Sequence, residues 1–91
     1  MNHLWNQTEV NKEAIQGETI SATFTYFGNK QIKRVTPSCA CVSVQVKKNH
    51  ITAKWLTKKK PSSYNSTKYL VVVFDDDSID ELKIHAELTK K

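Results

Sequence analysis

The sequence has few glycines, prolines and cysteines, the residues that most often form tight turns, break strands or form disulfides. Its 91 residues include two glycines, two prolines and two cysteines. It contains no glycine-rich phosphate loop, no nucleophile-elbow motif and no pair of histidines at metal-ligand spacing. No apolar run approaches the roughly 20 residues that a membrane-spanning helix needs. We therefore expect one small domain with no membrane contact, no cofactor and no enzyme activity.

Acidic residues are missing from the middle of the chain. None occurs between Thr19 and Phe74, and the net charge of the whole chain is +5. One part of the surface should therefore be basic, which favours an acidic partner; a solvated lysine-rich surface without a partner is the alternative. The basic residues of this span are Lys30, Lys33, Arg34, Lys47, Lys48, Lys54, Lys58, Lys59, Lys60 and Lys68.

The first residues also lack the marks of a secretory signal, which are a basic start and an apolar core. We expect the chain either to stay in the cytosol where it is made or to have lost a leader. Residues 1–16 are polar and predict an N-terminal arm, with one short strand or a short helix, that orders only on docking. Trp5 stands out there because an indole usually packs against something, so it is a candidate partner contact.

Alternation of apolar and polar residues dominates residues 17–91 and is typical of half-buried strands. The continuous apolar run Tyr69–Phe74 predicts a central strand, buried on both faces or lying at an interface. Turns are predicted at Gly28-Asn29, through positive φ angles, at Lys48-Asn49 and over residues 75–78, and a loop over residues 58–67. The alternating strands are predicted over residues 19–27, 30–35, 42–47, 51–56 and 82–88.

With the arm, about seven short strands fit the chain, and no helical period is sustained. We therefore predict an all-β fold, a single Ig-like antiparallel β-sandwich over residues 17–91. A half-barrel of the OB type is the alternative. The side chains expected to be largely buried are Phe24, Val44, Trp55, Val72 and Ile84.

The two cysteines lie two residues apart, in Ser38-Cys39-Ala40-Cys41. In an extended strand such residues share a face, and a soft metal such as Cu(I) accepts a pair of sulfurs. A disulfide between them would close a very small ring, and free cysteine is a common core residue. We expect reduced, metal-free thiols, and Cys39 and Cys41 stay as weak metal candidates.

The stretch Ser38-Cys39-Ala40-Cys41-Val42 resembles the Ser-Cys-Gly-Cys-Thr signature of a widespread bacterial Ig-like family of unknown function, related in shape to the ASH and major-sperm-protein sandwiches. Ala40 and Val42 replace the glycine and threonine of that signature. The family's aromatic strand and Asn/Gly turn are matched by Phe24, Tyr26, Gly28 and Asn29. The resemblance implies an Ig-like sandwich. Small leaderless domains of this kind are similar to bacteriophage virion accessories that decorate capsids.

These observations predict a non-enzymatic attachment protein, with a bacteriophage capsid decoration (auxiliary) protein as the leading setting. Such a chain is made in the host cytoplasm, binds the major capsid protein and ends on the capsid surface of the virion. The first alternative is a basic nucleic-acid-binding module, because lysines near aromatic side chains suit phosphates and bases. The second is a copper- or redox-handling protein using Cys39 and Cys41. The candidate partner contacts are Trp5, Lys58, Lys59, Lys60 and Tyr64.

Overall fold

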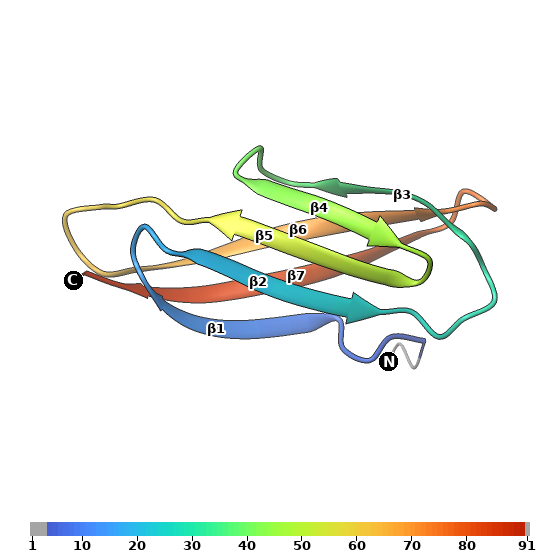
Figure 1. Cartoon of the computed structure of the whole chain (residues 1–91), viewed down its shortest axis with the longest axis horizontal. Coiled ribbons are helices and arrows are strands. Elements are labelled where there is room, and N and C mark those ends of the chain that lie inside the picture. The colour runs from blue at the N-terminus through green and yellow to red at the C-terminus, as the bar shows by residue number, and fades with distance from the viewer. Residues whose placement is uncertain (1–3, 91) are drawn as a thin grey trace.

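The chain folds into two β-sheets packed face to face (Figure 1). The computed structural model describes residues 4–90, and none of its elements there is a helix long and apolar enough to cross a membrane. Sheet I has the strand order β1-β7-β6-β3, and sheet II has the order β2-β5-β4. The seven strands are β1 (Glu9–Ile15), β2 (Thr19–Thr25), β3 (Ile32–Pro37), β4 (Val42–Lys47), β5 (His50–Leu56), β6 (Tyr64–Phe74) and β7 (Ile79–Thr89).

The strand order is that of an immunoglobulin-type sandwich. Lettered A to G in chain order, strands B, E and D form sheet II, and strands C, F and G lie in sheet I, as in immunoglobulin domains. This confirms the predicted all-β sandwich. The first strand differs from the prediction, because β1 pairs with β7 in parallel, with Val10 opposite Ile84. The other strand pairs are antiparallel.

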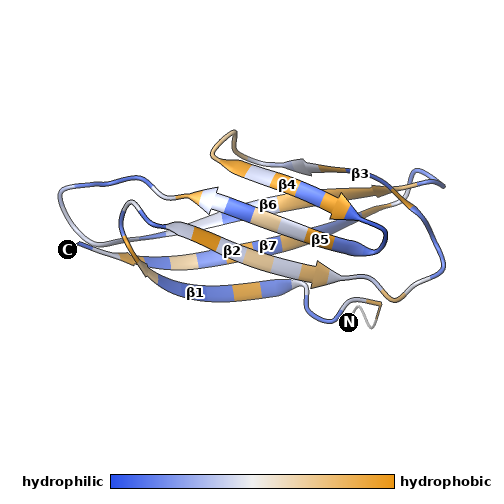
Figure 2. Cartoon of the chain, in the orientation of Figure 1, coloured by the Kyte–Doolittle hydropathy of each residue, from blue (hydrophilic) through white to orange (hydrophobic). Residues whose placement is uncertain are grey.

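Every second side chain of the strands points between the sheets, because strand residues alternate between two faces. Bands of apolar and polar residues therefore alternate along β1 and β4 (Figure 2). Four of the five predicted core residues are buried, namely Phe24, Trp55, Val72 and Ile84. Val44 is the exception: it is only partly buried. It lies on β4, an edge strand of sheet II, and no further strand of that sheet covers its outer side.

The N-terminal residues do not form a separate arm. Residues 9–15 form β1 and complete one edge of sheet I. The segment before it is also fixed: the Asn6 N–H donates to the Thr25 carbonyl at 3.0 Å, and the Thr25 N–H donates to the Asn6 side-chain oxygen at 2.8 Å. The expectation that residues 1–16 order only on docking is therefore wrong for residues 4–16, and residues 1–3 lie outside the described part.

Gly28 does not form the positive-φ hairpin turn that the sequence predicted. Residues 26–31 instead carry the chain from β2 in sheet II to β3 in sheet I. Gly28 is needed there because a Cβ atom on it would overlap the Tyr26 hydroxyl. The left-handed φ angles lie at Gly17, Lys48 and Asp77; Lys48 belongs to the predicted two-residue turn between β4 and β5.

Strand β6 begins at Tyr64, so the loop predicted over residues 58–67 ends earlier. Within β6, Leu70 and Val72 point into the core, and the alternate residues Tyr69, Val71 and Val73 face outward from sheet I. Val73 is buried but Tyr69 is exposed, so only part of the apolar run is covered on both faces.

Candidate protein-binding surface

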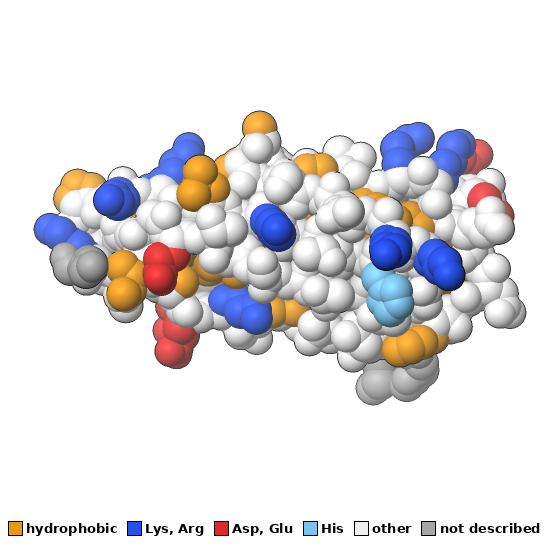
Figure 3. Space-filling model, in the orientation of Figure 1, with side chains coloured by type: hydrophobic (Ala, Val, Ile, Leu, Met, Phe, Trp, Pro, Cys, Tyr) orange, Lys and Arg blue, Asp and Glu red, His pale blue; other side chains and the backbone are white. Residues whose placement is uncertain are grey.

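The fold turns the uneven distribution of acids along the chain into an uneven distribution in space. All three strands of sheet II lie within the acid-free span 19–74, whereas β1, β7 and the turn before β7 carry the acids of sheet I. In the view of Figure 3, lysines are spread over the molecule and acidic side chains lie towards its ends and lower margin. Sheet II therefore presents an outer face that carries basic and hydroxyl groups and no carboxylate.

Three of the predicted contact residues, Lys58, Lys59 and Lys60, are exposed together in the connection between β5 and β6. We call residues 57–63 the lysine loop. The buried side chain of Gln16 holds it from below: its amide oxygen accepts the Lys60 N–H at 2.6 Å, and its amide nitrogen donates to the Ser62 carbonyl at 2.8 Å. Both polar ends of this buried amide are thus satisfied by the loop backbone, which fixes the loop's shape.

Two further side chains fasten the ends of the lysine loop. Buried Thr57 donates its hydroxyl to the Glu18 carbonyl at 2.7 Å and accepts the Gly17 N–H at 2.9 Å. Tyr64 donates its hydroxyl to the Lys58 carbonyl at 2.6 Å, and the Lys60 ammonium lies 4.4 Å from the centre of the Tyr64 ring. Tyr64 therefore joins the lysines, as the sequence predicted, and it supports the loop from beneath.

Trp5 lies at the opposite end of the molecule and is not an exposed contact. Its indole is 5% exposed and packs against Tyr26 and Phe74, with ring centroids 5.0 and 6.5 Å away. Its indole N–H donates to Asp80 at 2.9 Å. Phe74 ends β6 and Tyr64 begins it, which separates the two ends by roughly 33 Å of extended strand. The prediction of Trp5 as a partner contact is corrected: it closes the core.

Cys39 and Cys41 form a disulfide, so the prediction of reduced thiols is wrong. Their Cα atoms are 5.2 Å apart, which is shorter than the roughly 6.6 Å between alternate residues of a strand. The chain turns between β3 and β4 at this point, and that turn brings the two sulfurs within bonding reach. In this form neither sulfur is a thiolate, the form that binds copper. Within residues 4–90 no group of three or more histidine, cysteine or acidic side chains is arranged to hold a metal ion.

One polar cluster on sheet I was not predicted. The two ring nitrogens of His85 contact the Glu9 carboxylate and the Thr67 hydroxyl, the latter at 2.7 Å. These side chains line an open groove of about 460 Å³ on the outer face of β1, β7 and β6. Alternation places His85 outward, but only the parallel register of β1 brings Glu9 beside it.

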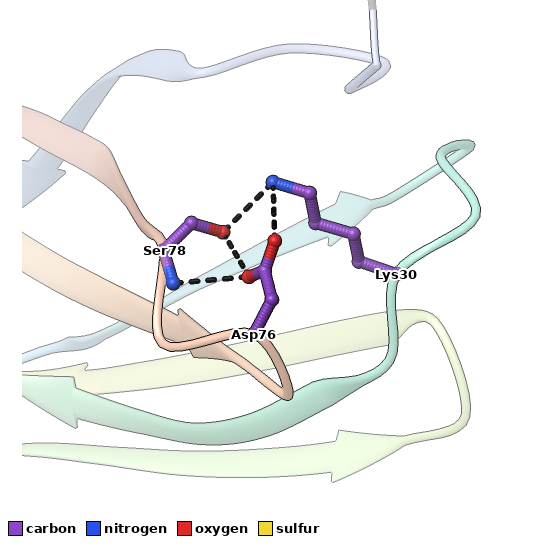
Figure 4. A network of polar contacts seen from close by, with 3 residues as sticks. All are labelled: Lys30, Asp76 and Ser78. Atoms are coloured by element: carbon purple, nitrogen blue, oxygen red, sulfur yellow. Dashed lines mark hydrogen bonds and ion pairs between the residues drawn. The ribbon is translucent and has the colours of Figure 1, made fainter.

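The acidic turn before β7 is organised by its own residues (Figure 4). Asp76 accepts hydrogen bonds from the hydroxyl and the backbone N–H of Ser78, and Lys30 pairs with its second oxygen at 3.2 Å. These contacts, the Ser78 hydroxyl first, lower the pKa of Asp76 from 3.8 to about 2. Beside it, Lys33 pairs with Asp77 at 3.1 Å.

Comparison with known proteins bears on the fold alone. No protein family matches the sequence, and no curated protein is similar to it. The solved structure of the Vibrio cholerae VesB protease contains a similar region, with a TM-score of 0.54 and 11% sequence identity. The match covers 93% of this chain and 31% of that one, so this chain spans about a third of that protein's length. An identity this low carries no activity from one protein to the other.

Proposed function

We propose that this chain is a non-enzymatic attachment domain that binds an acidic surface of a larger protein assembly. The setting we propose is a bacteriophage capsid, on whose outer surface the chain would serve as an auxiliary subunit bound to the major capsid protein. The lysine loop is the observation that carries the proposal. It presents three adjacent ammonium groups on a backbone held by Gln16, Thr57 and Tyr64.

The fixed shape of the loop favours a specific partner. A preformed loop loses little conformational entropy on binding, so more of the interaction free energy remains as affinity. Charge complementarity steers encounter and sets orientation, while apolar contacts supply much of the affinity. Leu56 offers such a contact, because it is exposed at the end of β5 immediately before the lysine loop.

A protein partner suits this surface better than a nucleic acid does. Modules that bind single strands combine basic groups with aromatic rings on which bases stack. Here Trp55 is buried, and the ring of Tyr64 is covered by the ammonium group of Lys60. The aromatic side chains on which the nucleic-acid alternative rests are thus engaged within the molecule.

Co-sedimentation with purified capsid shells tests the proposal. Wild type should sediment with shells, and a variant with Lys58, Lys59 and Lys60 changed to Glu should bind at least about tenfold more weakly. The matched control changes Lys12, Arg34 and Lys83 to Glu, which alters the net charge equally but at positions outside the loop; its binding should stay within about twofold.

Two outcomes would overturn the proposal. If both triple variants lose binding equally, net charge and not the lysine loop is responsible. If wild type never sediments with shells but binds single-stranded DNA tightly at physiological salt, the chain is a nucleic-acid-binding module.

A further inference from the structure

The sandwich has four edge strands, and three of them are protected against pairing with another chain. In β3, Pro37 lacks an N–H group and the register shifts between Ile32 and Arg34. In β1, charged Lys12 occupies an inward-facing position between Val10 and Ala14. These are devices by which natural sheets keep their edges from pairing.

The edge of β2 is protected by the N-terminal segment. Asn6 bonds to both backbone groups of Thr25, and the Gln7 side chain donates to the Thr23 carbonyl at 3.0 Å. Three of the outward backbone groups at the C-terminal end of β2 are therefore hydrogen-bonded within the chain and are not free to pair with another strand.

Strand β4 is unprotected. The Leu56 N–H donates to the Cys41 carbonyl, and in an antiparallel ladder the residues bonded to the neighbour alternate. Cys41, Ser43, Gln45 and Lys47 therefore bond to β5. It follows that Val44 and Val46 point their N–H and C=O groups away from the sheet, where no residue among 4–90 bonds to them.

The side chains of β4 also leave room for another strand. Val46 is 41% exposed although it faces inward, and Val44 is only partly buried. Next to Val46 lies a cleft of about 500 Å³ with an apolar floor that includes Ile32 and Tyr26 and a rim that includes Lys30 and Lys48. A strand added beside β4 would place alternate side chains against these valines and towards this cleft.

We propose that β4 binds an extended segment of the partner as an additional strand, in which apolar residues alternate with acidic ones. The apolar set would cover Val44 and Val46, and the acidic set would lie beside Lys47 on the outer face of sheet II. Charge complementarity supports this occupant, because β3, β4 and β5 contain no acidic residue. The inference rests on the proposed function and names how the partner is held.

A second copy of this chain fits the edge less well. Each copy carries a net charge of +5 and has no acidic residue in β3, β4 or β5, so pairing β4 with the β4 strand of another copy would bring two basic margins together. An acidic segment meets no such repulsion.

Amide hydrogen exchange measured by NMR tests the proposal directly. The probe is the synthetic peptide acetyl-Glu-Val-Glu-Val-Glu-Val-Glu-amide, with the corresponding lysine-valine peptide as its control. In the free protein the amides of Val44 and Val46 should exchange fast and that of Gln45 slowly. The acidic peptide should slow Val44 and Val46 by about tenfold or more and leave Ser21 of β2 unchanged.

A pair of variants of β4 gives the matched control. Val46→Lys places a charge on the inward side of the edge and should weaken peptide binding by about tenfold. Gln45→Lys introduces the same residue on the outward side and should not weaken it. Both positions are exposed in the free protein, so neither change is expected to unfold it.

Each other result has a definite meaning. Protection of β2 amides, no protection at all, or equal binding of the lysine peptide would overturn the proposal. Protection of the Val44 and Val46 amides without peptide, increasing with protein concentration, would also overturn it. A second copy of the chain would then occupy the edge of β4. If the protein binds shells while the Val44 and Val46 amides stay unprotected, the proposal of an added strand at β4 fails and the attachment function stands. If the protein binds the acidic peptide but no assembly, β4 binds an added strand and the proposed attachment function fails.

Discussion

The two sheets differ in whether their charged side chains are paired within the molecule. Within residues 4–90, the two Lys–Asp ion pairs, Lys30 with Asp76 and Lys33 with Asp77, lie in turns or strands next to sheet I. The contact of His85 with Glu9 lies on the same sheet. Within the same residues no ion pair involves Lys47, Lys54 or the lysine loop. The two sheets also differ at their edges, because both edge strands of sheet I are protected and β4 of sheet II is not.

This difference shows which side of the molecule leaves charges and backbone groups without partners within the described residues. Basic side chains contact three carboxylates of sheet I and its turn, those of Glu9, Asp76 and Asp77. Sheet II instead exposes cations, two half-covered valines and free backbone groups along one margin. Exposed ion pairs contribute little to stability, so the lack of pairs does not weaken sheet II. It leaves that side with charge and hydrogen-bonding capacity for a partner.

The largest expected effect separates the shared core from the open edge. Phe24→Ala should lower the free energy of unfolding by about 3–5 kcal/mol, because a fully buried ring leaves a cavity. Val44→Ala should cost only about 1 kcal/mol, because Val44 is partly covered. Urea unfolding measures both, and equal losses would show that β4 is as well packed as β2.

The second expected effect concerns the residue that ties the two sheets together at one end. Trp5 packs on Tyr26 of sheet II's crossover and on Phe74 of sheet I. Trp5→Ala should lower the free energy of unfolding by about 3 kcal/mol. It should also speed amide exchange at Thr25, because the segment that covers the β2 edge is released.

Phe27→Ala is the control for Trp5, since Phe27 is 63% exposed in the same region and its removal should change the free energy of unfolding by less than about 0.5 kcal/mol. If Trp5→Ala behaves like Phe27→Ala, then Trp5 is a surface contact, as the sequence alone suggested, and does not belong to the core.

Strands β2, β4, β5 and β7 were predictable because each carries a strong alternation, as in Thr19–Thr25 with Phe24 inward, and β6 was predictable from its continuous apolar run. The positions that were not predictable depend on pairing between distant residues. Trp5 read as an exposed contact because its partners, Phe74 and Asp80, lie far along the chain. Nothing local signals that β1 pairs in parallel with β7 or that a buried amide at Gln16 supports the lysine loop.

The cysteines show the same limit on a short scale. Residues two apart in an extended strand are poorly placed for a disulfide, but a bend between β3 and β4 shortens the distance. Sequence alternation located the strands on either side without revealing this bend. The open edge was also hidden, because Val42, Val44 and Val46 look like an ordinary buried set until the strand order places β4 at the margin.

A smaller effect is expected from the disulfide at the start of β4. Changing Cys39 and Cys41 together to Ser should lower the free energy of unfolding by no more than about 2 kcal/mol, because so short a loop restricts the unfolded chain little. Thermal unfolding with and without a reductant measures this. If reduction unfolds the wild type at room temperature, the bond is a main support of the sandwich. If the reductant changes nothing and two free thiols are found in the protein before it is added, the disulfide does not form.

The smallest expected effect concerns the paired charges of sheet I and involves no measurable loss of fold. Because the pKa of Asp76 is lowered from 3.8 to about 2, its contribution to stability is present above pH 3.8 and is lost as the pH falls through about 2. Ser78→Ala should raise this pKa towards 3.8, and Lys30→Gln should raise it less, because the Ser78 hydrogen bonds are the larger cause. NMR titration of the Asp76 carboxyl carbon gives both values. A larger rise in Lys30→Gln would mean that the ion pair holds the charge, and an ordinary pKa in the wild type would mean that the acidic turn is as free to meet a partner as the lysines of sheet II.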